Sequence, residues 1–203
     1  MGLVNKILEL QTFDYIYFVV DDSGSMNNQT DTRNPQTGMP ITRWEETRSR
    51  LLQLMELLSF IPTQTIIISF LNRNIQLELI HQNGQHPDTF FRSSCDKINN
   101  AFAQRPGGTL FPHFDNLKLI IGTTPYAAKI QQVFSQFIGK KVSWYFYGDG
   151  VPDGGSAGIR QIENTVLHRQ NPQQNPVTFF SCTGEDSEVE WMKNLEGFNI
   201  ENN

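Results

Sequence analysis

Strand-length apolar runs alternate along the chain with segments whose apolar residues recur every three or four positions. The clearest runs cover 15–20, 65–71, 142–147 and 176–182, and they are rich in β-branched and aromatic side chains. Such continuous runs are typical of strands that are buried on both faces of a sheet. A shorter run at 75–80 follows the second one after three residues, which permits only an antiparallel pair.

Helical periodicity falls between these runs. Thr42 and Glu45 have the spacing of a capping box, and the helix that they start carries an apolar stripe. The stripes, in chain order, are Trp44, Thr47, Leu51, Met55 and Leu58; Phe91, Cys95, Ile98 and Phe102; Ala127, Ile130, Phe134 and Phe137; Ile159, Ile162 and Val166; and Val189, Met192 and Leu195. This alternation predicts an α/β fold: a doubly wound, mostly parallel central sheet with one short antiparallel edge strand and helices on both faces.

Residues 26–43 interrupt this order. The segment is polar and contains Pro35, Gly38 and Pro40, so we expect a surface excursion between the first strand and the first long helix. Either it shapes the choice of a partner at the adjacent strand end, or it is a tolerated insertion. The sequence leaves both interpretations open.

The first apolar run ends in a cluster of oxygen-bearing side chains. Asp21, Ser23 and Ser25 alternate with Asp22 and Gly24, so the first three can converge while the intervening side chains turn away. Open α/β sheets bind ligands at the carboxyl ends of their strands. Short oxygen ligands crowded together favour a hard divalent cation over zinc.

Asp-x-Ser-x-Ser after a hydrophobic strand resembles the first element of the metal-ion-dependent adhesion site of von Willebrand factor A (VWA) domains. The two later elements of that family have counterparts in Thr109 of Gly107-Gly108-Thr109 and in Asp149 of Tyr147-Gly148-Asp149-Gly150. The resemblance covers about residues 13–195, so we expect a single domain over residues 1–203. The family usually begins its first helix soon after the second serine, and the chain ends earlier than we expect of the family, as a fragment of a longer protein would.

This resemblance implies a function and a set of ligands. Ser23, Ser25 and Thr109 would supply hydroxyl ligands to Mg²⁺ or Mn²⁺, and Asp21 and Asp149 would bind through ordered waters or, for one of them, directly. An acidic side chain of another protein would complete the coordination. The expected protein is therefore a metal-dependent protein-binding module of the adhesion or scaffold type, and not an enzyme.

Two alternatives remain. Carboxylates and Mg²⁺ at strand ends also build hydrolytic and phosphoryl-transfer sites, although the chain has no Walker-type lysine loop and no glycine before Ser23 at the nucleophile-elbow position. The second alternative is a structural domain that holds no ion.

We expect the remaining polar residues near these strand ends to have structural roles. Asp22 should face away from the site and Asp153 should close a turn, and the four histidines have no zinc spacing.

Composition and charge restrict the classes of partner that we expect. The formal net charge of −5 offers no basic surface for nucleic acid or anionic lipid. No apolar run approaches the roughly 20 residues of a membrane-spanning helix, so we expect no membrane insertion. The first ten residues lack the apolar core of a secretory signal, and Cys95 and Cys182 are typical of reduced core thiols; both point to a cytoplasmic location.

Overall fold

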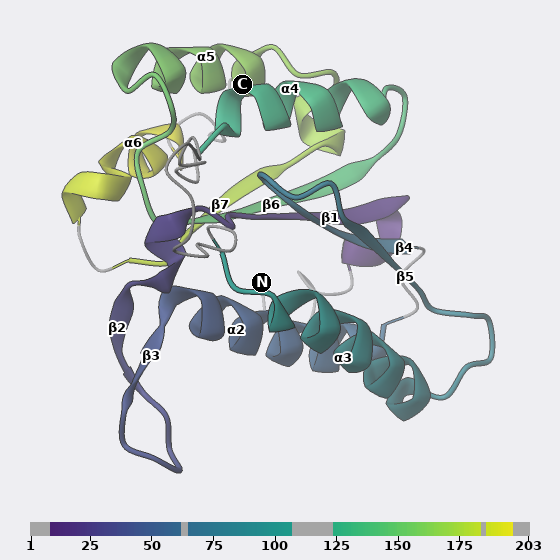
Figure 1. Ribbon diagram of the computed structural model, residues 1–203. Helices are drawn as coiled ribbons and strands as arrows, with labels where there is room; N and C mark the ends of the chain where they lie inside the picture. The colour runs from purple at the N-terminus through teal and green to yellow at the C-terminus, as the bar shows by residue number, and fades with distance from the viewer. Residues whose placement is uncertain (1–8, 62–64, 107–123, 184–185, 197–203) are drawn as a thin grey trace.

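The computed structural model describes residues 9–61, 65–106, 124–183 and 186–196, which form three layers with a β-sheet between two sets of helices (Figure 1). The strands are β1 (Tyr15–Val20), β2 (Gln29–Arg33), β3 (Pro40–Thr42), β4 (Thr65–Phe70), β5 (Gln76–Ile80), β6 (Val142–Gly148) and β7 (Val177–Ser181). The α-helices are α2 (Arg43–Ser59), α3 (Pro87–Ala103), α4 (Tyr126–Gln136), α5 (Ser156–Leu167) and α6 (Asp186–Glu196). Short 3-10 turns η1 (Leu10–Thr12), η2 (Gly24–Asn27) and η3 (Pro172–Gln174) lie in the connections.

Five strands form the central sheet in the order β5-β4-β1-β6-β7. The pairs β1–β4, β1–β6 and β6–β7 are parallel, and β5 pairs antiparallel with β4 at the edge. The predicted fold class is therefore confirmed. The chain goes from β1 to β4 on one side and later to β6 on the other side, so the winding direction changes at β1.

Apolar side chains of β1 alternate between two cores. Ile16, Phe18 and Val20 lie in the core that α2 and α3 cover, whereas Tyr17 and Val19 lie in the core under α4, α5 and α6. Figure 1 shows the same division, with α2 and α3 on one face of the sheet and the other three helices on the opposite face. Because both faces are covered, the strand sequence is continuously apolar.

Helix α2 begins with the predicted capping box. The Thr42 hydroxyl accepts a hydrogen bond from the Glu45 amide (3.2 Å), and the Glu45 carboxylate accepts one from the Thr42 amide (2.8 Å). All five residues of its predicted apolar stripe are buried. The box fixes the direction in which α2 leaves the preceding segment.

The segment 26–43 has more regular structure than we predicted. After η2 it forms an antiparallel hairpin of β2 and β3, in which Gln29 pairs with Thr42 and Arg33 with Pro40. Most of its side chains are exposed or half-buried, as expected of a surface excursion, but the hairpin itself was not predicted. A hairpin with no buried face leaves no alternation of apolar and polar residues to detect.

Two apolar stripes are rotated from their predicted positions. In α3 the fully buried residues are Phe90, Ser94, Ile98 and Phe102, and Phe91 and Cys95 are only half-buried. His81, in the loop after β5, stacks on Phe90 with ring centroids 4.7 Å apart and so covers the Phe90 side of α3. In α4 the fully buried residues are Tyr126, Ile130 and Val133.

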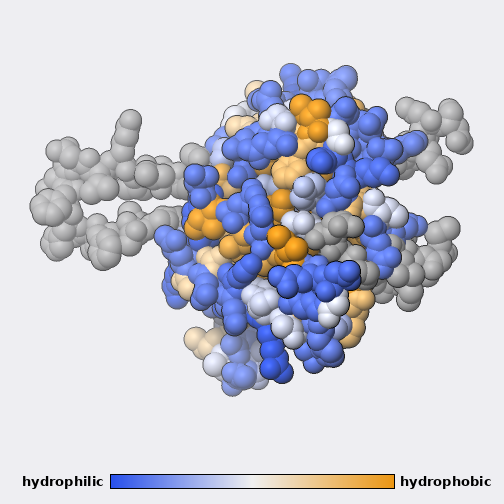
Figure 2. Space-filling model, turned by 90° about the vertical axis from the view of Figure 1, so that its right-hand side faces the viewer, coloured by the Kyte–Doolittle hydropathy of each residue, from blue (hydrophilic) through white to orange (hydrophobic). Residues whose placement is uncertain are grey.

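Viewed from the side away from the hairpin, the surface is mostly hydrophilic, with apolar side chains in separate small patches (Figure 2). Large exposed apolar side chains include Phe60, Ile80 and Ile138. None of the described helices combines the length and the apolar character needed to cross a membrane.

Candidate functional site

The ends of β1 and β6 bring the predicted carboxylates together. These strands are neighbours in the sheet, Val20 is in register with Tyr147, and the Asp21 amide donates to the Tyr147 carbonyl at 2.9 Å. Asp21 and Asp149 therefore leave adjacent strand ends, at the point where the winding of the sheet reverses.

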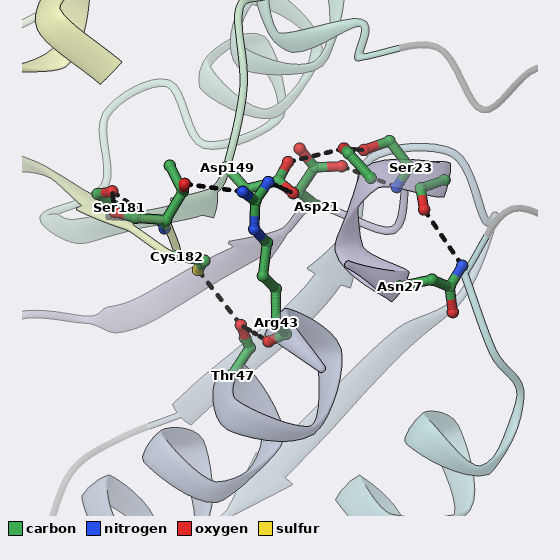
Figure 3. Close-up of polar contacts among 11 residues, drawn as sticks. Asp21, Ser23, Asn27, Arg43, Thr47, Asp149, Ser181 and Cys182 are labelled. Atoms are coloured by element: carbon green, nitrogen blue, oxygen red, sulfur yellow. Dashed lines mark hydrogen bonds and ion pairs between the residues drawn. The ribbon is translucent and has the colours of Figure 1, made fainter. Parts of the chain in front are cut away.

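A chain of hydrogen bonds joins four of the five predicted ligands (Figure 3). The Ser23 amide donates to Oδ1 of Asp21 (2.8 Å), and the hydroxyls of Ser23 and Ser25 lie 3.0 Å apart. The Ser25 hydroxyl donates to Oδ1 of Asp149 (2.8 Å). Turn η2 begins directly after Ser23 and contains Ser25, which brings the two hydroxyls within hydrogen-bond distance.

Asp21 has an unsatisfied oxygen in this cluster. Its side chain is fully buried, and Oδ2 has no hydrogen-bond partner among the described residues. Burial raises the pKa of Asp21 to about 7; the hydrogen bonds from Ser23 act in the opposite direction, and the nearby charges of Asp149 and Asp22 raise the pKa further. A buried carboxylate oxygen without a donor is costly unless a cation or a proton satisfies it.

Arg43 is a residue of the site that our sequence reasoning missed. It is the first residue of α2, and its guanidinium reaches Asp149, with Nη1 2.7 Å from Oδ2 (Figure 3). The same group donates from Nη2 to the hydroxyl of Thr183 at 2.8 Å. Both members of the ion pair are buried. A basic residue before a helical stripe is common, so only the tertiary structure singles it out.

Gly148 is required before Asp149 because of Tyr126. A Cβ atom at Gly148 would lie 1.7 Å from the Tyr126 hydroxyl, which donates to the Tyr147 carbonyl at 2.8 Å. Neither Gly148 nor Gly150 has a positive φ, so a left-handed backbone is not the reason for either glycine. Close approach of a buried tyrosine is the reason for the first of them.

Asp22 turns away from the site, as predicted. Its two oxygens accept hydrogen bonds from the Asn72 amide (2.8 Å) and from Nε of Arg73 (2.9 Å). The Arg73 guanidinium lies 4.0 Å from the centroid of the Phe70 ring. Asp22 therefore holds the turn between β4 and β5, and its negative charge is paired.

Three further residues were considered from the sequence: Asp153, Thr109 and His113. Asp153 accepts a hydrogen bond from the Thr124 amide (2.9 Å), so it joins the segment after β6 to the chain before α4, where we had expected it to close a local turn. Thr109 and His113 lie outside the described residues. Within the described ranges no three His, Cys, Asp or Glu side chains are grouped so that they could hold a metal ion.

A polar groove of about 380 Å³ lies beside the cluster. It is lined by β2, the first turns of α2 and the end of β7, namely Gln29, Thr30, Asp31, Thr32, Arg43, Glu46, Arg50, Ser181, Cys182 and Thr183. The thiol of Cys182 contacts the Thr47 hydroxyl at 3.2 Å, and that hydroxyl also bonds to the Arg43 carbonyl at 2.9 Å. Burial raises the pKa of Cys182 to about 12.

No protein-family model matches the chain, and no curated protein matches it in sequence. Among solved structures it resembles a mutant of the PilB minor pilin from Streptococcus sanguinis (TM-score 0.61, 12% identity), with 91% of this chain and 54% of that chain covered. The chain thus spans about half the length of that protein.

It also resembles the TFIIH p34 N-terminal domain (TM-score 0.50, 12% identity, 93% and 90% of the two chains). The VWA domain of SpRpn10 matches at a TM-score of 0.48 and 8% identity, with 94% and 84% covered. The likenesses to the pilin and to the TFIIH domain show the fold, which is that of a von Willebrand factor A domain, as the sequence resemblance implied.

Proposed function

We propose, on the premise of this fold, that the chain is a divalent-cation-dependent protein-binding domain. Asp21, Ser23, Ser25 and Asp149, joined by Thr109, would hold Mg²⁺ or Mn²⁺. A carboxylate of a partner protein would occupy a remaining coordination position. We also propose that residues 1–203 form one domain.

The observation that carries this proposal is the unsatisfied Oδ2 of Asp21. The oxygen is buried next to two serine hydroxyls and a second carboxylate, all at the strand ends where open α/β sheets bind ligands. Mg²⁺ takes oxygen ligands and keeps several of its waters, so one or two carboxylates with neutral hydroxyls suit it. When bound, the ion would act as a Lewis acid toward the carboxylate of a partner.

The position of Pro106 supports the assignment of Thr109. The Asn27 side chain donates to the Pro106 carbonyl (3.0 Å) and to the Gly24 carbonyl (3.2 Å), so the chain before Thr109 passes beside η2.

The surroundings of Ser23 are not those of a serine nucleophile. Its hydroxyl contacts the Ser25 hydroxyl, and none of the described histidines contacts it. A serine nucleophile needs an adjacent base to accept its proton. The geometry therefore gives no specific support to Ser23 as a nucleophile.

The test is titration of metal-stripped protein with Mn²⁺ and with Mg²⁺ by calorimetry. We expect saturable binding at one site, which Asp21→Ala and Ser23→Ala abolish while the circular dichroism spectrum is unchanged. Asp153→Ala is the matched control, because this carboxylate accepts a hydrogen bond from the Thr124 amide outside the cluster. Equal ion affinity in the wild type and in Asp21→Ala would refute the site.

A further inference from the structure

Arg43 occupies a position that neither the helix dipole nor burial of a charge favours. A cation in the first turn of a helix faces the positive end of the helix dipole. A guanidinium that is 8% exposed also loses hydration, and only a close anionic partner compensates for that loss. Asp149 is such a partner, and it accepts a hydrogen bond from Arg43 on Oδ2 and one from Ser25 on Oδ1.

The segment 26–43 positions Arg43 at the site. The Arg43 amide donates to the Asn28 carbonyl (2.9 Å), at the start of the β2–β3 hairpin. Thr42 ends β3 and caps α2, so the last residue of the hairpin directly precedes Arg43. The segment that departs from the usual family pattern thus fixes the backbone of the one arginine that contacts Asp149 among the described residues.

A guanidinium at Asp149 acts against a metal ion bound beside the same carboxylate. Arginine stays protonated at any physiological pH, so its charge is permanent. Like charges a few ångströms apart in a buried site repel each other more strongly than in water. The Arg43 charge therefore lowers the affinity of the cluster at the ends of β1 and β6 for a divalent cation when no further anion is present.

We propose that Arg43 sets the cation affinity of this site and makes its loaded form select an acidic partner group. With a divalent ion bound, the ion and the Arg43 guanidinium are two positive groups beside Asp149. A partner carboxylate adds a negative charge near both groups, so cation and partner strengthen each other's binding. This inference deepens the proposed function and rests on it for the identity of the ligand.

The experiment measures Mn²⁺ affinity by electron paramagnetic resonance of the free ion, in the wild type, Arg43→Gln and Arg43→Lys. We expect Arg43→Gln to bind Mn²⁺ about tenfold more tightly or better, and Arg43→Lys to stay within about threefold of the wild type. Arg50→Gln is the matched control, since Arg50 lies on the same helix, lines the same groove and pairs with Glu46. Its affinity should equal that of the wild type.

A second arm uses acetate as the carboxylate probe. Acetate should tighten Mn²⁺ binding to the wild type and have a smaller effect on Arg43→Gln. If Arg43→Gln unfolds without metal, recovery of its circular dichroism with Mn²⁺ supports the inference, and failure to recover overturns it.

The outcomes separate the two proposals. If Arg43→Gln binds Mn²⁺ and the wild type does not, the result supports the role of Arg43 and refutes metal dependence of the wild type. Equal or weaker binding by Arg43→Gln overturns the role of Arg43 and leaves the metal site standing. Absence of binding in both proteins overturns both.

Discussion

Asp21 and Asp22 are consecutive carboxylates with opposite surroundings. Both are buried, but Asp22 has an arginine and a backbone amide as donors, whereas one oxygen of Asp21 has no donor among the described residues. The difference arises because alternate residues at a strand end point to opposite sides. One side faces the β4–β5 turn and the other faces Asp149.

Amide replacements of the two residues should therefore change stability in opposite directions. In metal-free protein at pH 8, Asp21→Asn should raise the free energy of unfolding by about 1–3 kcal/mol, because it removes a buried charge and keeps the acceptor for the Ser23 amide. Asp22→Asn should lower it by about 3 kcal/mol, because it leaves Arg73 without its anion. Urea denaturation with a chelator present measures both values, and a loss of stability in Asp21→Asn would contradict our account of the unsatisfied oxygen.

The cysteines should differ in reactivity. Burial raises the pKa of Cys182 to about 12, so its thiolate is nearly absent at pH 8, and Cys95 is half-buried with a pKa that burial also raises. We expect iodoacetamide to label Cys95 slowly in the native protein and Cys182 only after denaturation. Mass spectrometry of the labelled peptides tests this order, and equal native labelling of both would show that Cys182 is accessible.

At the scale of elements, the site depends on where helices meet strand ends. Helix α2 supplies Arg43, η2 supplies Ser25, and α4 supplies the tyrosine that supports the end of β6. Tyr126 is completely buried, and its hydroxyl satisfies the carbonyl of Tyr147. The fit of α4 against β6 therefore fixes the backbone from which Asp149 projects.

A methyl group at Gly148 should disrupt this fit. Gly148→Ala should cost about 2 kcal/mol or more, because the new Cβ overlaps the Tyr126 hydroxyl and the buried ring has little room to move. Gly150→Ala is the control, since a Cβ there meets nothing within 4 Å. Thermal denaturation compares them, and Tyr126→Phe should recover part of the loss in Gly148→Ala.

At the scale of the whole molecule, the site joins segments that are far apart in the chain. Asp21 and Asp149 are held by the two central strands β1 and β6, and Arg43 links them to Thr183 after β7. A ligand at this junction contacts the folded state alone, because the unfolded chain does not assemble the cluster. Its binding energy therefore adds to the stability of the fold.

Divalent cations should consequently stabilise the protein. At a free Mg²⁺ concentration 100 times its Kd, the gain is about 2.7 kcal/mol. For a chain of this size each kcal/mol raises Tm by about 2–4 °C, so we expect an increase of about 5–11 °C. Asp21→Asn should show no such increase in differential scanning calorimetry. An equal increase with Asp21→Asn would place the stabilising cation elsewhere.

The sequence by itself determined the order of elements, the parallel sheet and the strand ends that carry Asp21 and Asp149. These features follow from local patterns: continuous apolar runs, helical stripes, a capping box and polar clusters directly after a strand. The hairpin in 26–43 was not predicted, because it buries no apolar face. The stripes of α3 and α4 were rotated, because the neighbours of each helix decide which residues become fully buried.

Only the tertiary structure decided how the carboxylates are neutralised. The sequence set Asp22 apart from Asp21 and Asp149 but gave no partner for any of the three: Asp22 pairs with Arg73, Asp149 pairs with Arg43, and Asp21 keeps an unsatisfied oxygen. Arg43 lies 106 positions from Asp149, and no spacing rule connects residues that far apart. Partners of buried charges are selected by the packing of whole elements, which is why the charge balance of the site became visible only in the fold.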